Sequence, residues 1–216
     1  MKFNFDNVVF RALGKMVDCI VVSFLWFLFS LPIFTIGAST TALYYTVHKS
    51  IRRSRGYIYS SFWHAFKTNF KQSTIMWLIM MVIYGVLYFD AYVMNGFLMN
   101  GETIGYLFYL FLILFVLVLV WSFFVFAYTA RFENTKLAIF KNCAVIALVN
   151  FPSTLLVLVT VLVSSFLIYL IPILLFLVPA CSFISLDLIL ERVFRKYMSP
   201  EDLAAEEESD KLDRDL

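Results

Sequence analysis

The sequence predicts an all-α protein, a polytopic bundle of helices that crosses a membrane. Of the 216 residues, 62% are hydrophobic and only 15% are charged, and the mean hydropathy is +0.86. A soluble domain carries about a quarter charged residues because its surface must face water. The uncharged runs are long enough to span a bilayer, and the basic residues cluster between them, as they do in cytoplasmic loops.

The first uncharged run extends from Cys19 to Val47 and contains 29 residues. One crossing needs roughly 20 residues, so the run is too long for one crossing and too short for two full ones. Pro32 breaks a helix because it lacks a backbone N–H, and Gly37 frees the backbone again. We predict a Pro-bent hairpin, with helices from about Met16 to Leu31 and from about Ser39 to Ile51. The alternative is one crossing and an interfacial helix, which gives five spans instead of six.

The distribution of basic residues favours the hairpin. Arg11 and Lys15 precede its first helix, and a basic loop follows its second helix. A hairpin keeps both groups in the cytoplasm, whereas a single crossing would export one of them. The predicted orientation therefore places both chain termini in the cytoplasm. Contacts with lipid headgroups are expected for the basic residues of the loop: Lys49, Arg52, Arg53, Arg55, Lys67 and Lys71.

Aromatic residues within the same region indicate an amphipathic helix between Gly56 and Lys71, at the inner interface. Phe62, Phe66 and Phe70 recur every four residues, and Trp63 is adjacent to the first of them. We expect these four residues to be inner-interface aromatics. His48 and His64 lie in or beside the basic loop and are interpreted in the same way. Binding of nucleic acid is not predicted for a segment held at a membrane.

Four further membrane helices are predicted from the remaining apolar runs. A second inner-face connection, over 131–150, separates the first two from the last two, and Pro179 is expected to kink the final helix. We therefore expect residues 1–198 to form a helical membrane domain, and the acidic segment 199–216 to be a flexible cytoplasmic tail. The four helices cover about 73–94, 104–130, 152–170 and 172–190.

The apolar segments lack the residue patterns of known catalytic chemistry. They contain no HExxH, no GxSxG and no His pair, and we expect no pair of buried acids. Cys19, Cys143 and Cys181 are far apart and are expected to be small buried residues. No enzyme activity, cofactor or metal site is predicted. Asp90 is a candidate membrane acid, although a carboxylate near the end of a helix is cheap to accommodate.

The helix break is the candidate site for a substrate or a partner. A discontinuous helix can hold a solute at the bilayer midplane. The competing interpretation is a structural turn whose hydroxyl groups satisfy the freed backbone. The residues of this candidate site are Pro32, Thr35, Gly37, Ser39, Tyr44 and Tyr45.

Two motifs in the first third of the chain resemble the YesL-like family of bacterial integral membrane proteins. The first comprises Trp26 and then Leu31-Pro32-x-x-Thr35-x-Gly37-Ala38-Ser39-Thr40-x-Ala42-Leu43-Tyr44, and the second is Phe62-x-x-x-Phe66-Lys67-x-Asn69-Phe70. The resemblance covers nearly the whole chain to about Tyr197. Members of this family resemble no enzyme. They are typically encoded in Gram-positive bacteria, beside carbohydrate-import ABC transporters and polysaccharide-degrading enzymes.

The resemblance implies a plasma-membrane protein linked to carbohydrate uptake. The predicted function is therefore an accessory or partner component of oligosaccharide uptake, with the lipid bilayer and sugar ABC permease subunits as partners. The alternative is an autonomous small-solute transporter or channel with its site at the Pro32–Gly37 break.

Overall fold

The computed structural model describes residues 8–53, 55–198 and 203–204, with side chains from Leu13 onward. This part of the chain consists of helices and contains no strand, so the predicted all-α fold class is confirmed. Apart from Leu203 and Ala204, the predicted acidic tail lies outside the described residues. The elements are α1 (Val8–Ser30), η1 (Ile33–Thr35), α2 (Ile36–Thr46), η2 (Val47–Arg52), α3 (Ile58–Met99), η3 (Thr103–Tyr106), α4 (Leu107–Arg131), α5 (Lys136–Val149), α6 (Phe151–Leu170), η4 (Pro172–Phe176) and α7 (Val178–Phe194).

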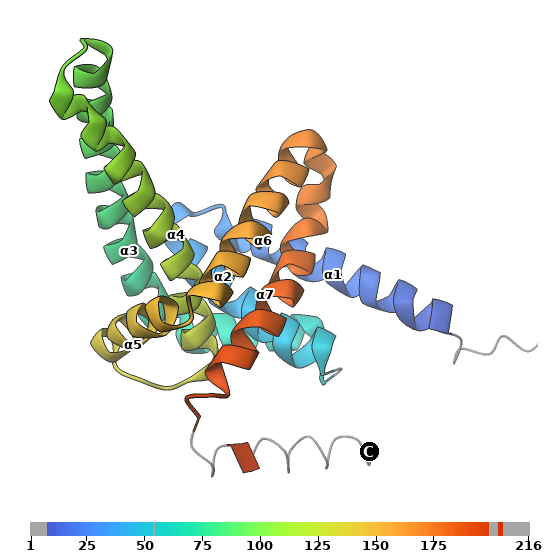
Figure 1. Ribbon diagram of the computed structural model, residues 1–216. Helices are drawn as coiled ribbons and strands as arrows, with labels where there is room; N and C mark the ends of the chain where they lie inside the picture. The colour runs from blue at the N-terminus through green and yellow to red at the C-terminus, as the bar shows by residue number, and fades with distance from the viewer. Residues whose placement is uncertain (1–7, 54, 199–202, 205–216) are drawn as a thin grey trace, which may run out of the picture.

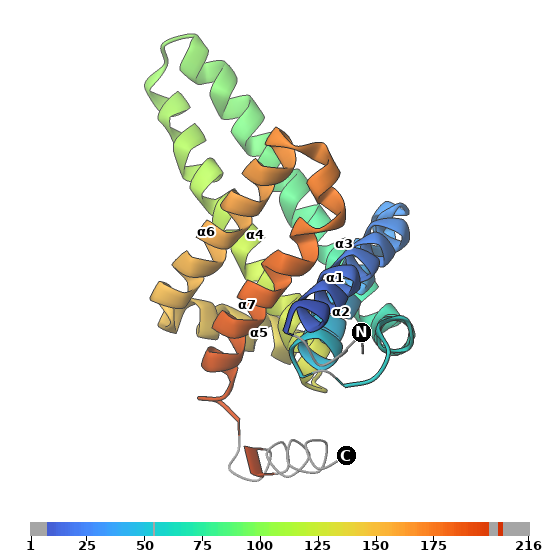
Figure 2. The same cartoon turned by 90° about the vertical axis from the view of Figure 1, so that its right-hand side faces the viewer.

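Two helical hairpins rise from a common base and separate toward their tips (Figure 1). One consists of α3 and α4, and the other of α6 and α7. Helix α5 lies across the base, and α1 and α2 run side by side in both views (Figures 1 and 2). Helix α2 is central, because every residue from Gly37 to Tyr44 is buried. The core therefore sits where α2 packs against α3, α4 and α7.

The chain folds back at Pro32 as predicted. Helix α1 ends at Ser30, Pro32 is extended, and the helix resumes at Ile33, earlier than the predicted Ser39. The Thr35 hydroxyl lies 2.6 Å from the carbonyl oxygens of both Phe29 and Pro32, and so holds the turn closed. The hydroxyl thus supplies a partner to the Phe29 carbonyl near the end of α1, while the Pro32 carbonyl also accepts from the Thr35 backbone N–H at 2.9 Å.

Close packing of α2 on α3 requires glycine at position 37. A Cβ atom there would lie 2.6 Å from Cβ of Trp77 and 2.7 Å from the backbone oxygen of Ser73. Any larger residue would push the two helices apart. Gly37 thus acts through a close approach of two helices. It lies in the first turn of α2 without a positive φ, so the helix-breaking role predicted for it is corrected.

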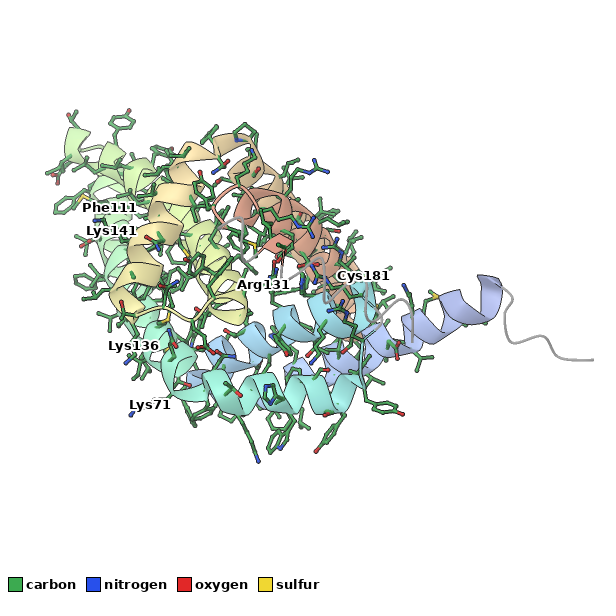
Figure 3. All side chains as sticks on the ribbon, turned by 90° about the horizontal axis from the view of Figure 1, so that it is seen from below. Lys71, Phe111, Arg131, Lys136, Lys141 and Cys181 are labelled. Carbon is green, nitrogen blue, oxygen red and sulfur yellow. The ribbon has the colours of Figure 1, made fainter. Side chains whose placement is uncertain are left out.

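Helix α3 corrects the prediction of a separate amphipathic segment before the third membrane helix. One helix of 42 residues runs from Ile58 to Met99. Its first part lies across the base, and the rest rises beside α4 (Figures 1 and 3). At 1.5 Å per residue it is about 63 Å long, roughly twice the thickness of a hydrocarbon core. The sequence between Ile58 and Ser73 contains no Gly or Pro, so nothing ends the helix there.

The last hairpin also differs from its prediction in one detail. Pro172–Phe176 form a short 3-10 helix, and α7 starts at Val178 with Pro179 in its first turn. A proline in the first turn costs no hydrogen bond, so Pro179 starts the helix and does not kink it. The predicted inner-face connection over 131–150 is largely helical, as α5.

Four described helices are long and apolar enough to cross a membrane. They are Leu13–Ser30 in α1, a part of α3, Thr103–Arg131 and α6. Helix α2 has 11 residues and α7 has 17, so both are short for a crossing. The fold is compatible with a multi-pass membrane protein, while the count of six spans, or five, stays a prediction.

Candidate functional site: an apolar cleft and a buried ion cluster

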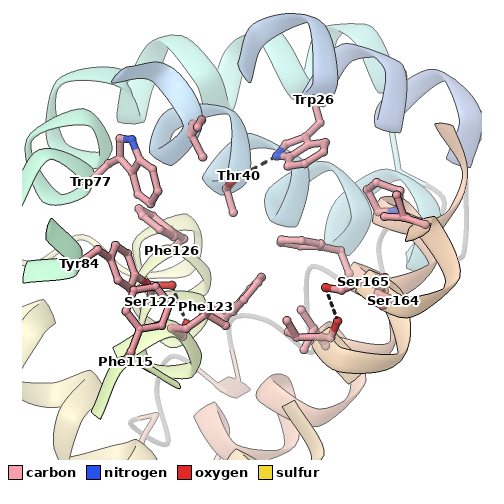
Figure 4. Close-up of a pocket in the computed structure, with 18 residues that line it drawn as sticks. Trp26, Thr40, Trp77, Tyr84, Phe115, Ser122, Phe123, Phe126, Ser164 and Ser165 are labelled. Atoms are coloured by element: carbon pink, nitrogen blue, oxygen red, sulfur yellow. Dashed lines mark hydrogen bonds between the residues drawn. The ribbon is translucent and has the colours of Figure 1, made fainter. Parts of the chain in front are cut away.

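A cleft of about 440 Å³ opens between the two hairpins, and six helices contribute to it (Figure 4). Its walls are mostly apolar and rich in aromatic residues, and no charged residue lines it. Because α1, α3, α4 and α6 contribute, all four candidate membrane spans line the cleft. The aromatic residues of the lining are Trp26, Trp77, Tyr84, Phe115, Phe123, Phe126 and Phe183.

The polar side chains of the cleft are already hydrogen-bonded within the protein. The indole N–H of Trp26 donates to the Thr40 hydroxyl at 3.2 Å, and that of Trp77 donates to a backbone carbonyl at 2.7 Å. The hydroxyls of Ser164 and Ser182 lie 2.6 Å apart (Figure 4). Backbone carbonyls accept bonds from the remaining hydroxyls: Tyr84, Ser122 and Ser165. The cleft therefore presents apolar surface to an occupant.

A buried ion cluster lies directly below the cleft along α7, where Leu186 lines the cleft and Asp187 belongs to the cluster. We use the name ion cluster for His48, Arg52, Arg131, Asp187 and Glu191. The structure leaves Asp187 0% and Glu191 5% exposed. Buried carboxylates are rare unless positive groups pair with them, so this pair requires an explanation.

Each carboxylate of the ion cluster is bound by a guanidinium group. Arg52 bonds Oδ2 of Asp187. Arg131 pairs with Glu191 through two nitrogens: its Nε lies 2.6 Å from Oε1, and its Nη2 donates a hydrogen bond of 3.1 Å to Oε2. His48 Nδ1 lies 2.8 Å from Oδ1 of Asp187 and 3.6 Å from Oε1 of Glu191. The charges of two carboxylates and two guanidinium groups thus cancel around His48.

Three elements bring these groups together. The residues on η2 and those on α7 are each four apart in sequence and so lie on one side of their helix. Arg131 is the last residue of α4 and lies near the middle of the base (Figure 3). Element η2 is a π-helix, a distortion that is frequent at functional sites.

Donor atoms of His48, Asp187 and Glu191 lie within 4.8 Å of one another, the spacing of a metal site. The charges disfavour such an ion, because a divalent cation would sit beside two guanidinium groups that already occupy the carboxylate oxygens. We therefore assign no metal ligands here.

The ion cluster corrects two expectations. A pair of buried acids was not expected, and His48, expected among the interfacial aromatics, is buried against Asp187 of α7. The available signal was a complementary spacing: a basic pair at positions 48 and 52, and an acidic pair at 187 and 191, each at the end of an apolar run. Opposite charges at equal spacing can pair across two helices.

The predicted helix-break residues do not form one site. Thr35 and Ser39 bond within the turn and to α1, and none of the six predicted residues lines the cleft. Tyr44 reaches the ion cluster, with its hydroxyl 3.5 Å from Oε1 of Glu191. Tyr45 instead accepts a bond from Lys49 at 3.3 Å.

The predicted inner-interface groups lie on η2 and on the first part of α3. Phe62 and Phe66 are buried against Phe29 of α1, whereas Phe70 is more exposed. Lys67 stacks over the Trp63 ring at 4.9 Å. The headgroup role predicted for the basic residues stays a prediction, although Arg52 contacts Asp187 inside the protein.

Other predicted residues do not line the cleft. Lys71 is exposed at the edge of the base (Figure 3). Arg53 and Arg55 follow η2, and Asp90 is half-buried on α3. Of the three cysteines, Cys19 and Cys143 are buried as expected, whereas Cys181 is exposed, which corrects the expectation for that residue.

The fold is an all-α bundle whose apolar helices reach membrane-spanning length, and it is compatible with a multi-pass membrane protein. Residues 19–91 match the family model described as "Protein of unknown function, DUF624". The matched stretch runs from α1 to the upper part of α3 and contains the Pro32 bend. YesL-like proteins belong to this family, so the match agrees with the resemblance at the family level. Comparisons with curated proteins and with solved structures found no match.

Proposed function

We propose that this chain is an accessory component of carbohydrate uptake in the plasma membrane, and that it binds a permease subunit by accepting one of its apolar helices in the cleft. The observation that carries this proposal is that the polar side chains lining the cleft are hydrogen-bonded within the protein, which leaves apolar surface for an occupant. The resemblance to YesL-like proteins supplies the link to carbohydrate uptake and the location in the plasma membrane. The expectation that the chain is not an enzyme is part of this proposal.

The chemistry of the cleft argues for a helix over a sugar as its occupant. A sugar in an apolar environment needs hydrogen-bond partners for its hydroxyls, since an unpaired hydroxyl costs about 1–3 kcal/mol. Here the N–H and O–H groups are largely committed to other acceptors. An apolar helix brings no such requirement. Its packing gains from close contact with aromatic walls and small residues, as is usual between membrane helices.

An autonomous small-solute transporter is the second candidate. The buried ion cluster favours it, because ionisable groups enclosed between membrane helices often lie on transport or proton pathways. Flux of labelled oligosaccharide into proteoliposomes that contain the chain alone would support this second candidate. Absence of flux, together with recovery of a permease complex, supports the accessory role.

Two serine variants test the accessory role. Ser165 and Ser185 are both exposed, and both donate a hydrogen bond to the carbonyl four residues earlier, but only Ser165 lines the cleft. Ser165→Phe places a ring in the cleft, and Ser185→Phe is its matched control. We expect carbohydrate ABC permease subunits to co-purify with the tagged chain from its host membranes in mild detergent. Ser165→Phe should reduce their recovery at least several-fold, and Ser185→Phe should not.

Two results would contradict the accessory role. One is purification of the chain without permease subunits in several mild detergents. The other is equal loss of the permease in both serine variants, because the effect would then not come from the cleft.

A further inference from the structure

His48 has a buried ring nitrogen that the rest of the ion cluster does not use. Its Nδ1 faces Asp187, but Nε2 is buried without a hydrogen-bond partner in the described structure. We propose that the ion cluster is a proton-binding site, with Nε2 of His48 as the proton acceptor, and that the bound proton loosens the link between α4 and α7. This inference does not depend on the accessory role.

The tautomer of His48 follows from its neighbour. Asp187 is bonded by Arg52, which holds it as a carboxylate, and a carboxylate can only accept hydrogen bonds. Nδ1 of His48 must therefore be the donor in the 2.8 Å contact with Asp187. In a neutral imidazole the other nitrogen then carries a lone pair. Nε2 is thus a vacant acceptor inside the protein.

The charges around His48 allow two protonation states. Asp187 and Glu191 on α7 favour the imidazolium, whereas Arg52 on η2 and Arg131 at the end of α4 oppose it. Tyr44 of α2 stacks on the imidazole at 6.5 Å with an interplanar angle of 5°. With a neutral histidine the two acids and two guanidinium groups sum to zero, and proton uptake adds one positive charge. Histidine is the side chain that ordinarily changes charge between about pH 5 and 8.

The ion cluster lies one side chain away from the solvent at the base. The Arg52 side chain is 32% exposed while it contacts the fully buried Asp187. The cluster is therefore connected to the surface along one side chain, although its carboxylates are enclosed.

Proton uptake would shift Glu191 between two positive partners. Its Oε1 is 2.6 Å from Nε of Arg131 and 3.6 Å from Nδ1 of His48, so both compete for the same oxygen. A positive imidazolium attracts this carboxylate and weakens its hold on Arg131. Because the hairpins separate above the base (Figure 1), a weaker link between α4 and α7 lets their tips move apart.

Histidine NMR tests the acceptor directly. The chain contains two histidines, so in a His64→Asn variant every imidazole signal belongs to His48. His64 is exposed on α3 and lies outside the ion cluster. In ¹⁵N-histidine-labelled protein in nanodiscs we expect Nδ1 to carry the proton at high pH, and Nε2 to gain one as the pH is lowered.

Charge variants link that titration to the ion cluster. Glu191→Gln removes a negative neighbour and should lower the midpoint of the Nε2 titration, and Arg52→Gln removes a positive one and should raise it. Lys49→Gln, on the same π-helix but bonded to Tyr45, should leave the midpoint unchanged. A proton on Nε2 at every pH, no titration, or a midpoint indifferent to both cluster variants would overturn the proposal. Saturable zinc binding to His48 at fixed pH would overturn it in favour of a metal site.

Distance measurement tests the mechanical consequence. Spin labels at Leu110 on α4 and Ile173 on η4, both exposed, report the separation of the hairpin tips once the three native cysteines are replaced. We expect the distance distribution to lengthen below the titration midpoint. In Glu191→Gln the dependence on pH should disappear, because Arg131 has no carboxylate to lose. An unchanged distribution across the titration would refute the proposed loosening.

Discussion

The pair formed by Arg131 and Glu191 permits a quantitative test of what holds the two hairpins together. The side chains of these residues are 16% and 7% exposed, so removal of either leaves a largely buried charge without its main partner. Such a loss typically costs 3–5 kcal/mol. Because His48 and Tyr44 also face Glu191, and Arg131 is partly exposed, we expect about 3 kcal/mol for each of Arg131→Met and Glu191→Leu, the low end of that range.

The double variant should be much closer to the parent protein than either single variant. Replacing both ions with apolar side chains removes the desolvation cost together with the attraction, and is often neutral or stabilising. We therefore expect a net loss below about 1 kcal/mol, and a coupling energy of several kcal/mol in the double-mutant cycle. Reversible unfolding in mixed micelles measures all four proteins. Additive losses would refute the reasoning, since each residue would then stabilise the fold independently.

Three further predictions concern other parts of the fold. Gly37→Ala should destabilise the protein by about 1–3 kcal/mol because its Cβ would overlap α3. A Cβ at Gly85 would have nothing within 4 Å, so Gly85→Ala should be neutral or stabilising. Thermal melting in detergent compares the two variants, and equal effects would contradict the close approach of α2 and α3. Thr35→Val should cost about 1 kcal/mol by removing the bonds that close the Pro32 turn, and an unchanged melting temperature would count against that role. Burial raises the pKa of the Cys143 thiol, so maleimide should label exposed Cys181 in the folded protein much faster than Cys143, and equal rates would refute the predicted packing of α5.

Helix positions could be predicted because their causes are local. Pro32 and Pro172 break the helix within longer apolar runs, and charged residues limit how far an apolar helix can extend, so the fold-back and the helix over Phe151–Leu170 follow from single residues. The boundary placed before Ser73 was wrong for a related reason. A change from amphipathic to apolar sequence does not end a helix when no helix breaker is present.

The ion cluster could not be predicted in the same way, because its pairs join distant parts of the chain. His48 and Asp187 are 139 residues apart, and Arg131 and Glu191 are 60 apart. Which charges meet depends on how α4, α7 and η2 pack, and the π-helical turn that aligns His48 with Arg52 has no sequence signature of its own. Equal spacing of the two pairs is suggestive only after the helices have been placed.

Membrane topology tests the central claim, that both hairpins rise from one cytoplasmic base through the plasma membrane. Single cysteines at Asn100, beside the tip of the first hairpin, and at Lys71, on the base, are both exposed and can be placed in a background without native cysteines. We expect a membrane-impermeant maleimide to label the Asn100→Cys variant in intact cells, and the Lys71→Cys variant only after permeabilisation. Labelling of Lys71→Cys from outside intact cells, or protection of Asn100→Cys, would contradict the account.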